Sequence, residues 1–131
     1  LLRTALRSPV DYTAISIHGK WIVAPGSAKS QRIGFELALP NNFADIDSSQ
    51  ANHMHVEFVV QALAAGKENP FISRRTVDIH LDPKGLEQIE HNGLTFRSTL
   101  ALAKGDYVVR FVVLDVLSGR MGSTSAPLKV D

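Results

Sequence analysis

The feature that most constrains the fold of this 131-residue chain is a corner followed by a long apolar strand. Leu102, Gly105 and Tyr107 are spaced as in a tyrosine corner, and Tyr107 opens a run rich in β-branched residues that extends to Leu117. In such a corner the tyrosine ring packs into the core near the start of the penultimate strand of a β-sandwich, and its hydroxyl bonds to backbone a few residues upstream. The motif therefore predicts a crossover between two packed sheets, and it indicates no chemistry.

The rest of the chain alternates between apolar and polar residues in short runs that are separated by turns rich in Gly, Pro and Asn. This period of two is typical of strands that bury one face. The runs predict strands at 12–23, 32–39, 53–63, 71–81, 94–102, 107–117 and 121–130.

One short helix interrupts this pattern. Asp82 can cap its N-terminus, Pro83 suits the first helical position, and Gly93 supplies the left-handed stop. We therefore expect an all-β, immunoglobulin- or fibronectin type III-like antiparallel sandwich of about seven strands with one short crossover helix. The sandwich should occupy residues 10–131, and residues 1–9 should be the remnant of a linker.

Composition excludes several classes of function. The net charge is +1 and no basic block is longer than Arg74-Arg75, so we expect no nucleic-acid partner. No apolar stretch is long enough to span a membrane, and the absence of cysteine excludes disulfides and thiol chemistry. The chain begins at Leu1 rather than at Met, from which we expect a piece of a longer polypeptide.

Histidines gather on one predicted strand face. His53 and His55 share the polar face of the 53–63 strand, and antiparallel pairing with the 71–81 strand should bring His55 near Asp78 or His80. Imidazoles with a carboxylate could hold zinc or copper. The alternative is a solvated polar face, which antiparallel sheets commonly have. We expect no metal and no cofactor, and keep this cluster as the alternative.

No pattern in the chain predicts catalysis. A Gly-x-Ser-x-Gly elbow, a phosphate loop and a facing pair of carboxylates are all missing. The segment Asp45-Ile-Asp-Ser-Ser49 resembles the start of a calcium loop, but Gln50 and Val56 occupy the positions that need Gly and Glu. We therefore expect a non-enzymatic domain.

A small-ligand or carbohydrate site is a further alternative. It would use the long 41–52 loop together with Trp21, whose ring could stack on a sugar. A core or half-buried strand aromatic is the favoured interpretation of Trp21, because no second exposed aromatic accompanies it.

The 107–117 strand is apolar on both faces, which a sandwich strand with one solvated face should not be. Val112, Leu114 and Val116 form the outward stripe. Such a stripe predicts cover by another domain, a second protomer or the N-terminal segment of this chain. The alternative is that β-branched residues stand there for strand propensity alone.

The corner and the turn Ser118-Gly-Arg-Met-Gly122 together resemble the last hairpin of the bacterial von Willebrand factor type A-related proteins that are abundant in Acidobacteria. The opening Ala5-Leu-Arg-Ser-Pro9 and Gly93-Leu-Thr-Phe96 are similar too, so the likeness spans most of the chain. The resemblance implies an exported, extracytoplasmic protein with a type A domain upstream. The ion site of that upstream domain is not reproduced at Asp45-Ile-Asp-Ser-Ser49.

From these observations we expect an accessory module that packs on the upstream type A domain and contacts a protein partner or a second copy. Val112, Leu114 and Val116 would form the interface, and Leu102, Gly105 and Tyr107 would hold the corner.

Overall fold

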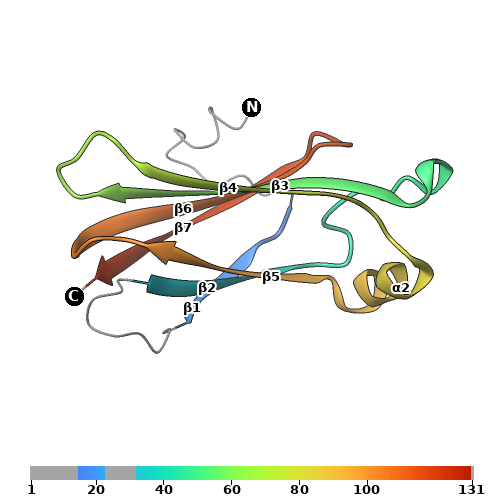
Figure 1. The fold of residues 1–131 in the computed structure, drawn as a ribbon, viewed down its shortest axis with the longest axis horizontal. Coiled ribbons are helices and arrows are strands. Elements are labelled where there is room, and N and C mark those ends of the chain that lie inside the picture. Colours follow the sequence, from blue (N-terminus) through green and yellow to red (C-terminus); the bar gives the residue numbers. More distant parts are fainter. Residues whose placement is uncertain (1–14, 23–31, 131) are drawn as a thin grey trace.

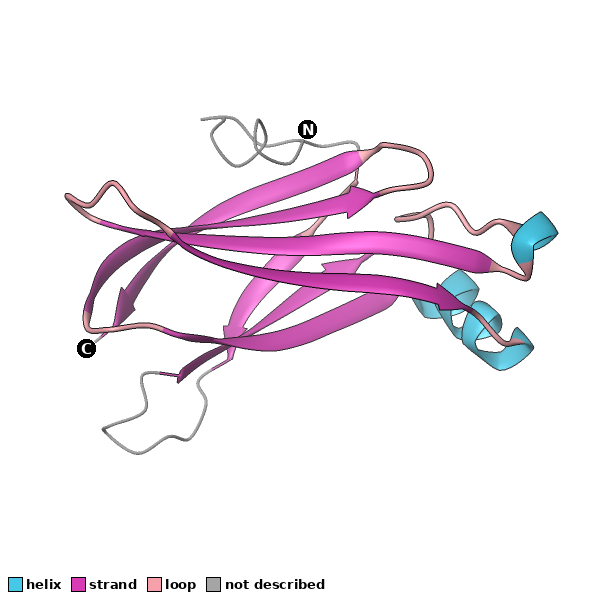
Figure 2. Ribbon diagram, turned by 45° about the horizontal axis from the view of Figure 1, so that its top comes forward, coloured by secondary structure: helices cyan, strands magenta, loops and turns pink. Residues whose placement is uncertain are grey.

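The computed structural model describes residues 15–22 and 32–130, which form two antiparallel sheets packed face to face (Figure 1). One sheet has the order β1 (His18–Ile22), β2 (Arg32–Leu39), β5 (Leu94–Ala101). The other has the order β4 (Phe71–His80), β3 (His53–Ala64), β6 (Gly105–Asp115), β7 (Met121–Val130). The prediction of an all-β antiparallel fold with one short α-helix is confirmed for the described residues, and the smaller helical segment in Figure 2 is a 3-10 turn at Ser48–Gln50.

The immunoglobulin- or fibronectin-like subclass stays a prediction. In the immunoglobulin constant type the fourth strand joins the sheet of the first, second and fifth strands, whereas here β4 pairs with β3. The predicted linker at 1–9 lies outside the described residues, as do both ends of the predicted strand at 12–23, of which residues 15–22 are described and residues 18–22 form β1.

The core lies between the two sheets and is built by alternation. On β3 the even-numbered residues Met54, Val56, Phe58, Val60 and Ala62 are all buried. The Phe58 ring stacks on Phe96 of the opposite sheet with centroids 4.1 Å apart. Burial of such a face is the main favourable contribution to stability, at about 25 cal/mol per Å² of apolar surface.

Helix α2 (Pro83–Asn92) forms where its caps predict it and carries the chain from β4 in one sheet to β5 in the other. The Asp82 carboxylate accepts a hydrogen bond from the Gly85 amide at 2.6 Å. Gly93 ends the helix with φ +70°, and a Cβ there would lie 2.1 Å from the Leu39 carbonyl oxygen. Only glycine satisfies both the backbone conformation and this close approach to β2.

The corner joins β5 and β6, one of the three consecutive strand pairs that lie in different sheets. The Tyr107 hydroxyl donates to the Ala103 carbonyl oxygen at 2.8 Å, while Leu102 is buried and Gly105 has φ +154°. This hydrogen bond fastens the crossover at the end of the sandwich opposite α2 (Figure 1). No helix within the described residues is long and apolar enough to cross a membrane.

Candidate functional site

Three side chains that could bind a metal converge on the outer face of the four-stranded sheet, where β3 begins and where β4 ends before α2. His53 and His55 project from β3 because they are two residues apart on its polar face. The register of β3 against β4 places His53 opposite His80 and His55 opposite Asp78. The strand pairing alone therefore brings these four side chains together.

The distances within the cluster are short. His53 Nε2 lies 2.5 Å from Asp78 Oδ1, and His55 Nδ1 lies 3.9 Å from Asp78 Oδ2. One ligand atom from each of the three residues lies within 4.8 Å of the other two. The imidazoles are about three-quarters buried, whereas the Asp78 side chain is 53% exposed, so the cluster is open to solvent on the carboxylate side.

The Asp78 carboxylate is electrostatically suited to a cation. The hydrogen bond from the His53 ring lowers the pKa of Asp78 below its usual range, against an opposing effect of burial, and the nearby His55 ring lowers this pKa further. The group therefore remains an anion through the whole neutral range.

His80 is held beside the cluster by the loop that precedes β3. Its Nδ1 lies 2.9 Å from the Gln50 carbonyl oxygen, and because a carbonyl only accepts, Nδ1 carries the proton. Nε2 then keeps its lone pair. The His80 ring centroid lies 5.1 Å from that of His53, so this imidazole flanks the three convergent residues.

This donor set is chemically suited to zinc or copper. Imidazole nitrogen and carboxylate oxygen are common ligands of both ions. Zinc ligands lie about 2.1 Å from the ion, so tetrahedral neighbours are separated by roughly 3.4 Å. The distances of 2.5 Å and 3.9 Å lie on either side of this value. Both of these ligand pairs thus lie within about 1 Å of the separation that zinc requires.

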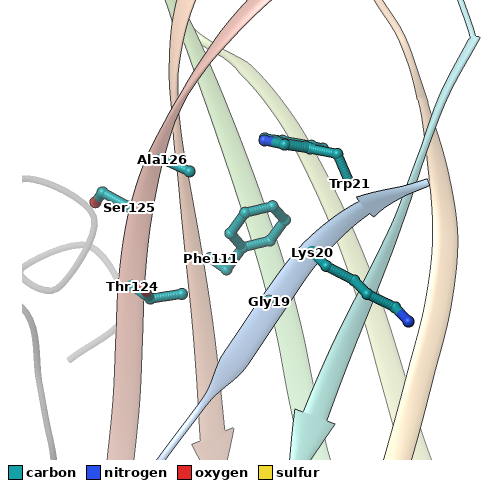
Figure 3. A pocket seen from close by; sticks show the side chains of 7 residues that line it. All are labelled: Gly19, Lys20, Trp21, Phe111, Thr124, Ser125 and Ala126. Atoms are coloured by element: carbon teal, nitrogen blue, oxygen red, sulfur yellow. The ribbon is translucent and has the colours of Figure 1, made fainter. Parts of the chain in front are cut away.

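Trp21 lies in a different place, at the gap between the edge strands β1 and β7 (Figure 3). Its half-buried ring packs against Phe111 with centroids 5.6 Å apart and lines a pocket of about 180 Å³. The Lys20 side chain points away from the two rings. Trp21 thus serves mainly as a core aromatic at the rim of the sandwich.

The 41–52 loop does not reach this pocket. Trp21 pairs with Phe35, four residues before the end of β2, and the loop begins beyond that end. At about 3.3 Å per residue this separation exceeds 13 Å. The structure therefore does not assemble the site that was predicted from Trp21 and the loop together.

The loop is instead bound to the β6–β7 turn through a buried carboxylate. Asp115 has no exposed area, and its Oδ2 accepts hydrogen bonds from the Asp45 amide at 2.9 Å and from the Ser118 hydroxyl at 2.5 Å. Arg120 donates to Asp45 Oδ1 at 3.1 Å. Asp115 and the turn Ser118-Gly-Arg120 thus have a structural role, because they tie these two loops together.

The predicted apolar stripe on β6 is only partly accessible. Val112 has no exposed area within this chain alone, and it packs with Val59 and Met121 in a small second apolar cluster. Leu114 packs against this cluster, whereas Val116 is 39% exposed. An interface at this stripe stays a prediction, and Val112 is not available for it.

Sequence reasoning missed the exposed apolar side chains of β4. Phe71, Ile72 and Ile79 are each more than 40% exposed. The neighbouring pair Phe71-Ile72 was a signal, since two adjacent apolar residues cannot both face the core of a strand.

Comparisons with known proteins give a fold and no family. No protein-family model and no curated protein matches the sequence. Among solved structures, the superoxide reductase (neelaredoxin) from Archaeoglobus fulgidus in the reduced form is similar, with a TM-score of 0.56 and 11% sequence identity. The match covers 88% of this chain and 89% of that chain.

This likeness corrects the expectation of a non-enzymatic domain. That prediction rested on missing catalytic motifs and was wrong, because the same fold, over nearly the whole chain, is that of an enzyme. At this level of identity the likeness concerns the fold alone, and the chemistry has to be argued from the residues present.

Proposed function

We propose that this domain binds one divalent transition-metal ion, zinc or copper, through His53, His55 and Asp78. The observation that carries the proposal is the convergence of two imidazoles and an ionised carboxylate within 4.8 Å on a solvent-open sheet face. Neutral imidazole and ionised carboxylate are the forms that bind metal, and the low pKa of Asp78 supplies the second.

Three protein ligands would leave a coordination position for water or for another molecule. Zinc sites with four protein ligands are typically structural, whereas those with three keep an open position. His80, whose ring centroid lies 5.1 Å from that of His53, is the candidate fourth ligand through Nε2. Whether His80 binds would therefore decide between a closed and an open site.

The test is isothermal titration of the metal-free domain with zinc and, separately, with copper. We expect a stoichiometry of one, and at least a tenfold loss of affinity in His53→Gln, His55→Gln and Asp78→Asn. His91→Gln is the matched control, because His91 is an exposed histidine on α2 outside the cluster. Equal affinity in all four variants would refute the site, since binding would then be nonspecific.

Contact with other proteins is a second candidate function, favoured by Val116 and Leu117, which are 39% and 40% exposed side by side at the end of β6. The sequence resemblance supports an exported von Willebrand factor type A-related protein, in which this domain would pack on an upstream type A domain. Val116→Asp should weaken binding of the separately expressed upstream domain by at least tenfold, with Lys129→Asp on β7 as the control. Unchanged binding in Val116→Asp would rule out this surface.

A further inference from the structure

The fourth strand leaves one long edge uncovered. β4 pairs with β3 only, and no strand among the described residues pairs with its other side. Eight of its ten residues are exposed, all except Ser73 and Val77. An uncovered edge of this length presents a row of backbone donors and acceptors to which another strand can be added.

The inward face of β4 extends beyond the smaller sheet. Phe71, Val77 and Ile79 pair across the ladder with the core residues Ala62, Val56 and Met54, so their side chains lie on the core side of the sheet. Phe71 and Ile79 are nevertheless 44% and 42% exposed. The four-stranded sheet therefore overhangs the three-stranded one along β4.

A groove of about 300 Å³ runs beneath this overhang. Val77 and Ile79 of β4, Ile89 of α2 and Phe96 of β5 are among the residues that line it. Its lining is almost entirely apolar, with Gln88 as a polar exception. The groove can therefore accept apolar side chains from a strand added at the β4 edge.

The middle of the same edge is basic. Arg74 and Arg75 are both exposed, and their cross-strand neighbours on β3 are the uncharged Val59 and Phe58. Arg75 shares the inward face with Val77 and Ile79, two and four residues away, because the strand period is two. A complementary strand would carry an acidic residue opposite Arg75 and apolar residues opposite Val77 and Ile79.

We propose that the β4 edge binds an extended, acidic segment of a partner protein by adding it to the sheet as a fifth strand. Main-chain hydrogen bonds would supply affinity, and the alternation of one acidic and two apolar side chains would supply specificity.

A second copy of this chain fits the same edge less well. A two-fold pairing of two β4 strands along their full length brings Arg74 and Arg75 of both copies together around the axis. Like charges at such close cross-strand positions are destabilising. Charge complementarity therefore favours an acidic partner over self-association.

This inference is independent of the proposed metal site. Asp78 lies on the outward face of β4, whereas Val77 and Ile79 lie on the inward face. The peptide binding described here should therefore be unchanged in His55→Gln, even if that variant loses metal binding.

The test uses a labelled ten-residue peptide with glutamate, valine and isoleucine at alternate positions and threonine between them. We expect saturable binding by fluorescence anisotropy, with amide shift changes in the NMR spectrum confined to Phe71–His80 and the groove. Arg75→Glu should weaken binding at least tenfold, and a peptide with lysine in place of glutamate should restore it. Arg97→Glu, an exposed arginine on β5 outside the groove, is the matched charge control.

Three results would overturn the inference. The first is that the glutamate peptide binds Arg75→Glu as tightly as it binds the parent. The second is that the changes in NMR amide shifts lie away from β4. The third is that sedimentation shows the parent dimerising through this edge. Thermal unfolding of each variant establishes that a loss of binding is not a loss of fold.

Discussion

Asp115 and Asp78 are both carboxylates within clusters of polar side chains, and their surroundings differ in kind. Asp115 is fully buried, and its neighbours are an amide, a hydroxyl and a guanidinium of this chain, all of which are donors. Asp78 is half exposed, and its neighbours are imidazoles, which have a lone pair to offer as well as a proton.

The difference separates a structural cluster from a binding one. Donors around the buried Asp115 carboxylate use the charge on its Oδ2 to hold loops together, and complete burial keeps this carboxylate away from an outside ion. Imidazoles around an exposed carboxylate can release their protons and turn their lone pairs toward a cation. The same residue type, aspartate, thus stabilises the fold in one place and can bind a ligand in the other.

The largest expected effect is that of removing the buried carboxylate. Asp115→Ala leaves the Asp45 amide and the Ser118 hydroxyl without their acceptor, and should lower the free energy of unfolding by about 3 kcal/mol. Urea denaturation followed by Trp21 fluorescence measures this. A loss under about 1 kcal/mol would mean that Asp115 is not the tie between the loops.

A smaller loss is expected from Arg120→Ala. Arg120 donates to Asp45 Oδ1 and to the Asn42 carbonyl oxygen, but its side chain is 37% exposed and water can replace part of these contacts. We expect a loss of about 1 kcal/mol in the same urea titration. A loss as large as that of Asp115→Ala would show that the guanidinium, rather than the carboxylate, organises the cluster.

In the cluster around Asp78, a substitution should abolish metal binding and leave the stability of the metal-free domain nearly unchanged. His55→Gln should change the free energy of unfolding of the metal-free domain by less than about 0.5 kcal/mol, because glutamine keeps a polar side chain of similar size on the outward face of β3, outside the core between the sheets. The increase in unfolding temperature on adding excess zinc should disappear in this variant. A variant that is strongly destabilised without metal would place His55 with the structural cluster.

The smallest expected effect is on how the free energy of unfolding depends on pH in the acid range. The folded-state pKa of Asp78 lies below its ordinary value of 3.8, so the unfolded chain takes up this proton first as the pH falls. The stabilisation from Asp78 is therefore complete above that value and is lost at lower pH. Between pH 5 and pH 3, with chelator present, Asp78→Asn should lose less stability than the parent in urea denaturation. Equal losses would contradict the ion pair with His53.

Local patterns in the sequence were sufficient to predict the elements. The alternation along β3 identified its core face, and Asp82, Pro83 and Gly93 located α2, because capping and periodicity act within a few residues. The approach of His53 and His55 to Asp78 also followed from strand pairing, since a short loop at 65–70 forces β3 and β4 into one hairpin.

Properties that depend on the packing of whole sheets could not be predicted. The complete burial of Val112 depends on what lies over the outer face of β6, which strand periodicity does not describe. The overhang of β4 follows from a four-stranded sheet packing on a three-stranded one, and the strand count of each sheet is a topological fact. The separation of Trp21 from the 41–52 loop likewise depends on the direction of β2.

The alternation on β3 has a consequence for how this domain can change over generations. Met54 and Val56 hold the fold from one side, while His53 and His55 occupy the positions between them on the other. A mutation at His53 or His55 leaves the packing between the sheets intact, whereas a slip of the register by one residue would exchange the two faces and the chain would fail to fold. This end of the outward face of β3, away from the buried Val59, is therefore a surface on which new ligand sets can be tried at little risk to the fold.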